Sequence, residues 1–234
     1  MNVLALDTSD SRGSVAVLCD ADLLASVSHD TDEDYSVWLL PAVERCLEQA
    51  GLVMKEIGVY AAAAGPGSFT GIRIGLTTVK AWSEAYGRPI VAVSRLQALA
   101  QMAIGEGTRV APFVDARRGQ VFGALYERLG GNVALSGDEM LISPANFVAY
   151  VAEKAGSHKV AWVSLDPEVL TDLEAWEGRE SAGETLEIVE PMLAETIGRI
   201  GLEKLRLGQT KDALTLDANY LRRTDAEMYW KDER

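Results

Sequence analysis

Short apolar runs separated by polar turns fill the first thirty residues of the chain. Residues 2–8, 13–20 and 23–29 are each apolar or alternating, and turn residues such as Asp, Ser and Gly lie between them. Short strands joined by tight turns pair with their neighbours in sequence. The N-terminal segment is therefore predicted to form an antiparallel meander of three strands.

Helical periodicity follows an acidic stretch. Across residues 35–51 apolar side chains recur at three- and four-residue spacing, and Gly51 is a typical stop signal. Proline lacks the backbone N–H that a helix interior needs, so Pro41 predicts either a kink or a later helix start. The residues that share the predicted buried face are Trp38, Leu39, Val43, Cys46, Leu47 and Ala50.

Strands and helices alternate through the rest of the first half. An apolar run at 57–64 predicts a strand, and 70–86 predicts a helix that Gly87 ends. Residues 89–94 and 95–104 predict a further strand and helix.

The pattern restarts after a Gly-Glu-Gly break. Residues 109–137 predict a strand, an Asp-containing turn and two more strands, with Asp115 in the position of Asp7 and Gly119 in that of Gly13. This strand-turn-strand unit recurs after about a hundred residues, which indicates internal duplication. Repeats of that length favour two related subdomains over a solenoid. The Gly-Gly-Asn segment inside this stretch is explained best as a hairpin turn.

A helix at 143–156, a strand at 159–164 and a helix at 193–208 complete a shorter second half. Repeated β-β-β-α-β-α halves resemble the actin/Hsp70-like ATPase (ASKHA, ribonuclease H-like) architecture. We therefore expect an α/β fold with two such related subdomains, the second one abbreviated. The predicted division is 1–106 for the N-terminal subdomain, 107–220 for the C-terminal subdomain and 221–234 for a polar tail.

Charge limits the classes of partner. The 234 residues carry a formal net charge of −13, which disfavours a nucleic-acid backbone unless Arg117–Arg118 or Arg222–Arg223 forms a basic patch. No apolar run approaches the roughly 18 residues of a membrane helix. An acidic turn also interrupts the N-terminal segment before a secretory leader could form. We expect a cytoplasmic protein with no direct contact to nucleic acid or membrane.

Few residues could serve as metal ligands or as catalytic nucleophiles. Cys19 and Cys46 lack CxxC spacing, and His29 and His158 have no second ligand at helical spacing, whereas a zinc centre needs three or four. No Ser or Cys stands in a G-x-S-x-G context. Neither a metal nor a hydrolase triad is expected.

Two aspartate-containing turns are the candidates for phosphate chemistry. Asp7-Thr8-Ser9 could bind Mg²⁺ or phosphate, or could equally form an Asx-type turn. In the second turn Asp115 is followed by Ala116 and Arg117, where a close phosphate cradle favours glycine. Both alternatives stay open for the first turn.

The loop GPGSFTG at 65–71 resembles a phosphate-binding loop but matches neither a P-loop nor G-x-G-x-x-G. Thr70 as a helix cap would expose N–H donors that attract anions. We favour packing: a tight turn, then Gly71 and Gly75 as a flat ridge for another helix. On this interpretation Gly75→Leu weakens dimerisation and leaves the monomer folded. The vestigial nucleotide-binding candidates are Asp7, Thr8, Ser68, Thr70 and Asp115.

Together these motifs resemble one family. LALDTSDSRGSVAV, AAAAGPGSFTGIRIGLTTVKAWSEAYGRPIVAVSRLQALA, FVDARRGQVFGALYE and ANYLRRTDAE are similar to the bacterial TsaB (YeaZ) family. The resemblance runs essentially from end to end. It implies an actin-like fold and a non-catalytic relative of TsaD, the subunit that makes N6-threonylcarbamoyladenosine at position 37 of tRNA.

The resemblance also implies partners and a surface. A TsaD-type subunit would bind this chain, the pair would recruit a TsaE-type ATPase, and a homodimer could form when the partner is absent. No cofactor is expected on the isolated chain, and the older M22 glycopeptidase label of the wider family finds no supporting residues. The two helices of the N-terminal subdomain would form the interface, with the residues Ser36, Leu39, Leu40, Val43, Leu47, Gly71, Arg73, Ile74, Gly75 and Thr78.

One departure from the family pattern affects this surface. Many members have a His-Ser/Thr pair where this chain has Tyr35-Ser36, a change at the start of the first predicted interface helix. The alternative function is an actin-fold ATPase or phosphotransferase that uses Asp7, Thr8 and Asp115 at its own nucleotide site.

Overall fold

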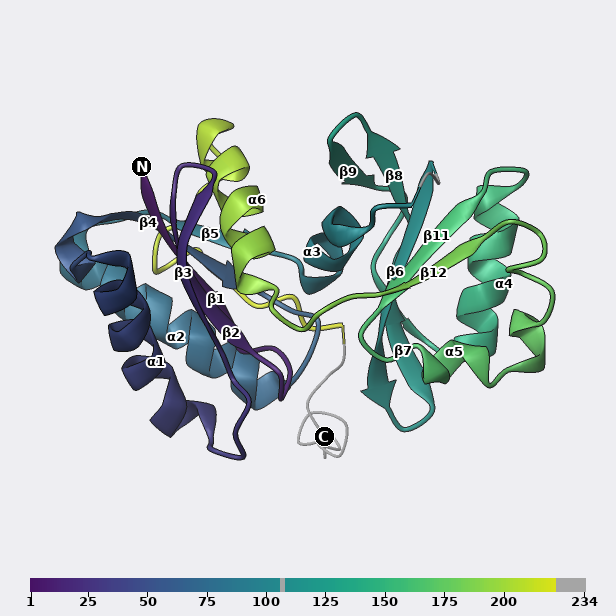
Figure 1. Ribbon diagram of the computed structural model, residues 1–234, viewed down its shortest axis with the longest axis horizontal. Coiled ribbons are helices and arrows are strands. Elements are labelled where there is room, and N and C mark those ends of the chain that lie inside the picture. The colour runs from purple at the N-terminus through teal and green to yellow at the C-terminus, as the bar shows by residue number, and fades with distance from the viewer. Residues whose placement is uncertain (106–107, 222–234) are drawn as a thin grey trace, which may run out of the picture.

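The computed structural model describes residues 1–105 and 108–221. Two twisted β-sheets stand side by side, each with helices on its outer face, and two further helices lie between them (Figure 1). We call the sheet of β1–β5 with its outer helices the first lobe, and the sheet of β6–β12 with its outer helices the second lobe. The mixed α/β fold agrees with the predicted actin-like architecture.

The first sheet has the strand order β3-β2-β1-β4-β5. Strands β1, β2 and β3 form the predicted antiparallel meander, whereas β4 and β5 are parallel to β1. Nearly every residue of β4 is buried, as is typical of a central strand covered on both faces. The bounds are β1 Asn2–Asp7, β2 Ser14–Cys19, β3 Asp22–Ser28, β4 Ile57–Ala63 and β5 Ile90–Val93.

Helices α1 (Tyr35–Ala50) and α2 (Phe69–Tyr86) cover the outer face of this sheet (Figure 1). A 3-10 turn at Met54–Glu56 precedes β4. Helix α1 runs through Pro41 without a break, so the predicted later start is wrong. The proline and Val37, whose carbonyl loses its usual donor, are both exposed, and water can satisfy that carbonyl.

The second sheet repeats the first. Its order β10-β7-β6-β11-β12 has the same connectivity as β3-β2-β1-β4-β5. Strands β8 and β9 extend it, since β8 pairs with the start of β6 and the Gly130–Gly131 turn joins β8 to β9, as predicted. The bounds are β6 Arg109–Arg117, β7 Gln120–Gly123, β8 Tyr126–Leu129, β9 Asn132–Leu135, β10 Met140–Ile142, β11 Val160–Ser164 and β12 Thr185–Ile188.

The helices of the second lobe account for its abbreviation. Helix α4 (Pro144–Ala155) covers the outer face of the sheet, but α5 (Glu168–Thr171) has only 4 residues where the first lobe has the 18-residue α2. A 3-10 turn at Glu174–Trp176 follows. Strands β10 and β12 and helix α5 lie in segments for which the sequence pattern predicted no element, because each is short and only partly buried.

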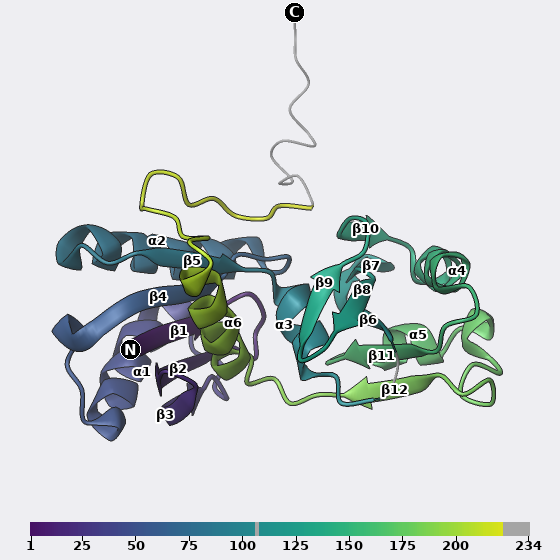
Figure 2. The same cartoon turned by 90° about the horizontal axis from the view of Figure 1, so that it is seen from above.

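The two central helices are exchanged between the halves of the chain. Helix α3 (Arg95–Met102) ends the first half yet packs on β6 and β11, while α6 (Ala194–Arg206) ends the second half and packs on β1, β2 and β4. Figure 2 shows α6 against the first sheet and α3 against the second. One hydrophobic core runs through this middle layer and joins residues of both sheets.

Parts of the predicted organisation lie outside the described residues. The boundary between 1–106 and 107–220 falls on residues that are not described, as do Arg222–Arg223 and nearly all of the predicted tail at 221–234. That division stays a prediction. Within 1–105 and 108–221, no helix is long and apolar enough to span a bilayer.

Candidate functional site

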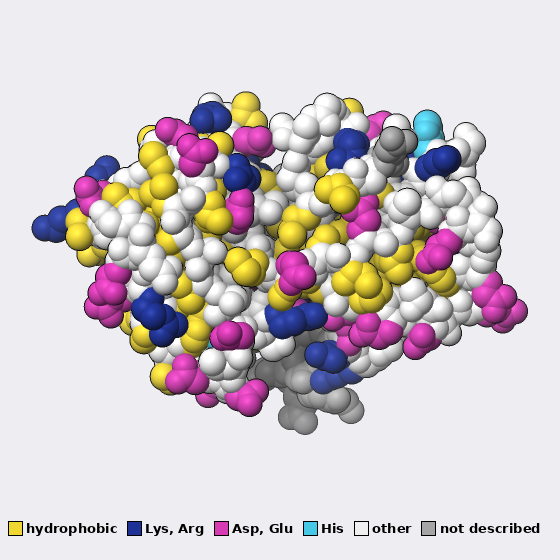
Figure 3. Space-filling model, viewed as in Figure 1, with side chains coloured by type: hydrophobic (Ala, Val, Ile, Leu, Met, Phe, Trp, Pro, Cys, Tyr) yellow, Lys and Arg dark blue, Asp and Glu magenta, His cyan; other side chains and the backbone are white. Residues whose placement is uncertain are grey.

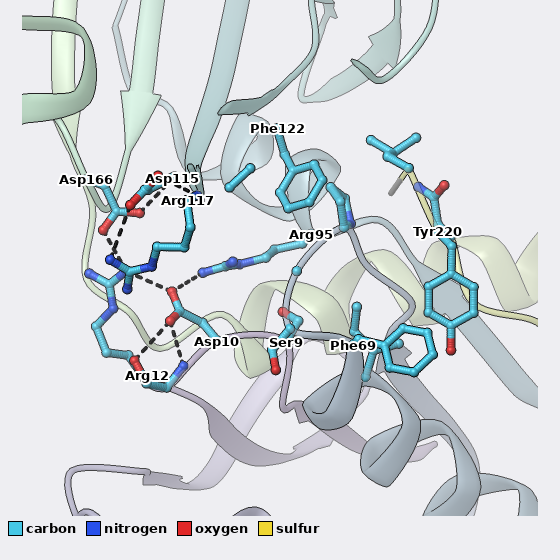
Figure 4. A pocket seen from close by; sticks show the side chains of 18 of the residues that line it. Ser9, Asp10, Arg12, Phe69, Arg95, Asp115, Arg117, Phe122, Asp166 and Tyr220 are labelled. Carbon is cyan, nitrogen blue, oxygen red and sulfur yellow. Dashed lines mark hydrogen bonds and ion pairs between the residues drawn. The ribbon is translucent and has the colours of Figure 1, made fainter. Parts of the chain in front are cut away.

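A cleft of about 540 Å³ opens where the two lobes meet. The β1–β2 loop and the loop before α2 form one wall, and the β6–β7 turn together with Asp166, two residues after the end of β11, forms the other. The cleft therefore lies where the duplicated halves face each other (Figure 4). Its lining includes Ser9, Asp10, Ser11, Arg12, Gly67, Ser68, Phe69, Arg95, Asp115, Arg117, Arg118, Phe122, Asp166, Asn219 and Tyr220.

Four charged side chains cross the floor of this cleft. The carboxylate of Asp10 accepts hydrogen bonds from Arg95 and, at 2.7 Å, from Arg12. Arg12 also lies 2.8 Å from Asp166 and donates to the carbonyl of Leu165 at 3.2 Å. We call Arg95, Asp10, Arg12 and Asp166 the interlobe ion-pair chain, because it joins the β1–β2 loop of the first lobe to the end of β11 in the second (Figure 4).

The side chains of the interlobe ion-pair chain stay charged although they are largely buried. Burial by itself would raise the pKa of Asp10, but Arg95 and Arg12 outweigh it and hold that pKa well below its usual value. Arg95 is only 3% exposed, and an arginine this buried needs a carboxylate partner. The two arginines and two aspartates of the interlobe ion-pair chain therefore neutralise one another, while Arg95 Nε is buried with no hydrogen-bond partner among the described residues.

The first predicted phosphate turn has internal partners. The Ser9 N–H donates to Asp7 Oδ1 at 2.9 Å, the bond of an Asx-type turn, and the Ser9 hydroxyl donates to the same oxygen at 2.5 Å. Thr8 Oγ1 donates to the carbonyl of Gly71 at 2.8 Å. Asp7 Oδ2 is buried and has no hydrogen-bond partner among the described residues.

Asp115 lies inside β6, not in a turn as predicted. Strand β6 continues to Arg117, and the turn is made by Arg118 and Gly119, because β6 bulges between Asp115 and Arg117. Asp115 accepts the N–H of Arg117 at 2.7 Å and pairs with its side chain at 3.2 Å. Arg117 and Arg118 have φ angles of +61° and +56°, values that glycine adopts more readily.

The loop before α2 differs from its prediction in one respect. Ser68, not Thr70, is the N-cap, and its hydroxyl accepts the N–H of Gly71 at 3.3 Å. Thr70 lies in the first turn of α2 and is exposed. Phe69 and Tyr220 stack beside this turn with ring centroids 4.9 Å apart, and the Arg73 guanidinium lies 3.6 Å from the Phe69 centroid.

The glycines of α2 face inward. A Cβ on Gly71 would overlap the carbonyl oxygen of Thr8, and one on Gly75 would overlap the Thr8 hydroxyl. The prediction of a flat glycine ridge open to another helix is therefore wrong. The two glycines let α2 approach the β1–β2 loop of its own chain.

A groove of about 360 Å³ between α1 and α2 collects most of the other predicted interface residues. Ser36, Leu40 and Arg73 are exposed there, and Ile74 and Thr78 are partly buried. Leu39 lines the groove but is buried, as are Val43 and Leu47 in the core beneath it. We call this surface the α1–α2 groove; its role as an interface stays a prediction. It is lined by Tyr35, Ser36, Leu39, Leu40, Arg73, Ile74, Thr77 and Thr78.

Several residues in and around the site were not predicted from the sequence. Arg95 stands in an otherwise apolar helix pattern, a signal that could have marked it as a buried ion-pair partner. Nothing in the sequence connects Asp10 with Arg12 and Asp166. Glu139 was also missed: it accepts bonds from Ser94, Asn219 and, at 3.0 Å, Tyr126, and so ties three distant segments together.

The remaining candidates stand apart from the cleft. His29 packs on Tyr35 and Trp38, and His158 Nδ1 lies 3.4 Å from the hydroxyl of Thr108. Among the described residues no group of three or more His, Cys, Asp or Glu could hold a metal ion. Lys and Arg side chains are spread over both lobes and stand among Asp and Glu on the face shown in Figure 3.

Comparison with known proteins gives a consistent picture. The model of the TsaD family, tRNA N6-adenosine threonylcarbamoyltransferase, matches residues 24–172. The tRNA threonylcarbamoyladenosine biosynthesis protein TsaB of Bacillus subtilis is 29% identical over 98% of both chains. The Escherichia coli protein of that name is 35% identical over 55% of this chain and 56% of its own length.

Solved structures extend the comparison to the fold. YeaZ from Pseudomonas aeruginosa has a TM-score of 0.76 and 29% identity, and the match covers 94% of this chain and 99% of that one. The ROK hexokinase from Thermus thermophilus has a TM-score of 0.55 at 15% identity, covering 88% of this chain and 100% of that one. At that identity the hexokinase shows the fold alone.

Proposed function

This chain belongs to the TsaD family and, within it, to the TsaB (YeaZ) family, and from this premise we propose that it serves tRNA threonylcarbamoyladenosine synthesis as a non-catalytic partner subunit. Its partners in this proposal are a TsaD-type catalytic subunit and, through it, a TsaE-type ATPase. The chain itself contributes a surface, not a reaction.

The interlobe ion-pair chain is the observation that carries the proposal. In actin-fold ATPases the Asp-bearing β1–β2 turns of the two halves face the nucleotide phosphates. Here Asp10, Arg12 and Asp166 bridge that space with bonds of 2.7 and 2.8 Å, and Asp115 is paired with Arg117. A phosphate group bound in that space would have to compete with Asp10 and Asp166 for Arg12 and would lie close to these two partly buried carboxylates.

The α1–α2 groove is the proposed contact for the TsaD-type subunit. Leu40 is 59% exposed at its edge, and Val37 beside it on α1 is 61% exposed, so the surface presents apolar side chains that a partner could bury. Arg73 adds a charged group, held by its contact with Phe69 and by a 3.1 Å bond to the Tyr220 hydroxyl. Apolar anchors beside an arginine are typical of interface hot spots.

Reconstitution tests the proposal directly. TsaD- and TsaE-type subunits are combined with substrate tRNA, with and without this chain, and modified adenosine is measured. We expect product only when the chain is present. Equal product without it would refute the proposed function.

A pair of matched variants then tests the surface. Leu40→Glu places a charge in the groove, and Leu129→Glu places the same charge at a 58% exposed leucine of the second lobe. We expect only the first to lower product and partner affinity, by tenfold or more for about 1.4 kcal/mol or more of lost contact. Equal effects of the two variants would exclude the groove.

One observation favours the alternative function. Asp7 Oδ2, buried and without a hydrogen-bond partner in the described part of the chain, is a ligand that a cation such as Mg²⁺ could use, as an actin-fold ATPase would require. Calorimetry with Mg-ATP on wild type and Asp7→Asn separates the two proposals. Micromolar binding with turnover that Asp7→Asn abolishes would replace the scaffold function with the enzymatic one.

A further inference from the structure

Side chains, not a cap, fix the start of α1. The side chain of the N-cap residue Asp34 does not cap the helix with a hydrogen bond, and the first turn contains no acidic residue. Instead, the hydroxyl of Tyr35, the first residue of the helix, donates to the carbonyl of Asp10. His29 reinforces the connection, because one ring nitrogen lies 2.8 Å from the carbonyl of Ser11 and the other 2.8 Å from that of Glu33.

The Tyr35 hydroxyl is seated inside the β1–β2 loop. A Cβ on Gly13 would overlap it, so this loop is shaped around the phenol. The Tyr35 ring lies 4.5 Å from His29 and 5.7 Å from Trp38, measured between centroids. Burial and the nearby Asp7 carboxylate raise the pKa of Tyr35, so the phenol stays a proton donor throughout the neutral range.

The backbone carbonyl and the carboxylate of Asp10 take part in two different contacts. Its carbonyl accepts the bond from Tyr35, and its carboxylate is the centre of the interlobe ion-pair chain. Tyr35 itself lines the α1–α2 groove. One loop residue therefore joins the groove on the outside of the first lobe to the pairing of Arg12 with Asp166 across the cleft.

We propose that Tyr35 is a positioning residue that couples the α1–α2 groove to the closure of the two lobes. The inference rests on the proposed function for the identity of the groove's partner, but the coupling is a property of the chain alone. Because coupling free energies are reciprocal, a partner that orders the start of α1 also strengthens the Arg12–Asp166 pairing. Loss of that pairing in turn weakens the binding of the partner.

Hydrogen exchange on the isolated chain tests the coupling without any partner. The reporters are the amides of Val37 and Trp38, which both donate to the Asp34 carbonyl in the first turn of α1, and that of Val169, which donates to the Asp166 carbonyl. Tyr35→Phe removes only the hydroxyl, and Arg12→Met breaks the pairing on the far side of the cleft. The matched control is Tyr60→Phe, because the Tyr60 hydroxyl is buried and has no partner within residues 1–105 and 108–221.

We expect each test variant to speed exchange at both reporter sites, by about fivefold or more, and the control to change neither. The double variant should exchange no faster than the stronger single one, since both act through Asp10. If Arg12→Met speeds exchange at Val169 but leaves Val37 and Trp38 unchanged, the coupling is refuted. Identical behaviour of Tyr35→Phe and Tyr60→Phe would refute it as well.

The affinity for a TsaD-type subunit provides a second test of the coupling. Arg12 does not line the groove, so an effect of Arg12→Met would not come from a lost contact inside the groove. We expect this variant to weaken binding of a TsaD-type subunit threefold or more, and an unchanged dissociation constant would overturn the inference. If the wild type itself binds no TsaD-type subunit, the proposed function fails, while the exchange experiment still decides the coupling.

Discussion

The guanidinium of Arg12 lies 2.8 Å from the carboxylate of Asp166, although the two residues are 154 positions apart in the chain. This pairing connects the β1–β2 loop of the first lobe with the end of β11 in the second. It crosses the cleft between the lobes, so the lobes are bridged by the protein's own side chains.

Arg12→Met is expected to lower the free energy of unfolding by about 2 kcal/mol, because Asp166 loses its interlobe partner in a partly buried site. Urea denaturation measures the change. Lys154→Met, which removes an exposed lysine whose neighbour is Glu153, should cost under about 0.5 kcal/mol. Equal costs would mean that the interlobe pairing contributes nothing beyond a surface ion pair.

Gly75→Ala should destabilise the fold by about 1 to 3 kcal/mol, since the added methyl group meets the Thr8 hydroxyl. Adding Thr8→Ala removes the obstructing oxygen, so the double variant should be more stable than the sum of the two single costs predicts. Thermal unfolding of all four proteins measures this cycle. Gly131→Ala, where a Cβ meets no atom within 4 Å, is the control. Additive costs would show that the two residues do not compete for space.

The pH dependence of stability should report on Asp10. Its pKa is lowered in the folded state, so its contribution is present above its ordinary pKa of about 4 and is lost as the pH falls through the folded value. Wild type should therefore exceed Asp10→Asn by about 3 kcal/mol at pH 7, and the difference should shrink below about pH 4. Urea midpoints between pH 7 and pH 3 test this. Asp32→Asn, on the exposed acidic stretch, controls for the change in net charge.

The two thiols should react at very different rates. Cys19 is partly exposed, whereas Cys46 is fully buried and burial raises its pKa to about 11. Ellman's reagent at pH 8 should titrate one thiol quickly and the second only when urea unfolds the chain. Cys19→Ser should remove the fast phase, and a fast phase that survives in this variant would contradict the buried position of Cys46.

The sequence pattern predicted the elements better than their contacts. Alternating and helical periodicities located the meander, α1, α2 and the duplication, because each reflects local burial. The spacing of Gly71 and Gly75 predicted a helix face without side chains. Periodicity does not say whether a partner helix or another part of the same chain packs against that face. Thr8 is that neighbour, more than sixty residues earlier in the sequence.

The site was predicted less completely than the fold. For Asp7 and Thr8 the sequence left a phosphate or Mg²⁺ site and an Asx-type turn open, and the bond from the Ser9 N–H to Asp7 shows the Asx-type turn. The bridge through Asp10 and Arg95 was missed because it depends on a contact between residues 85 positions apart. Thr70 was predicted as the N-cap, and only the bond that the Gly71 N–H donates to the Ser68 hydroxyl identifies Ser68 instead. Short segments such as β12 escaped prediction because 4 half-buried residues carry no clear period.

The exchange of α3 and α6 between the halves has a consequence during biosynthesis. All five strands of the first sheet have left the ribosome once residue 93 is clear of it, but the helix that covers one face of that sheet begins only at Ala194. For the intervening hundred residues the nascent chain must carry an open apolar surface. Neither half of the chain carries the helix that covers the inner face of its own sheet, and chaperones that shield apolar surface have their longest period of access before α6 emerges.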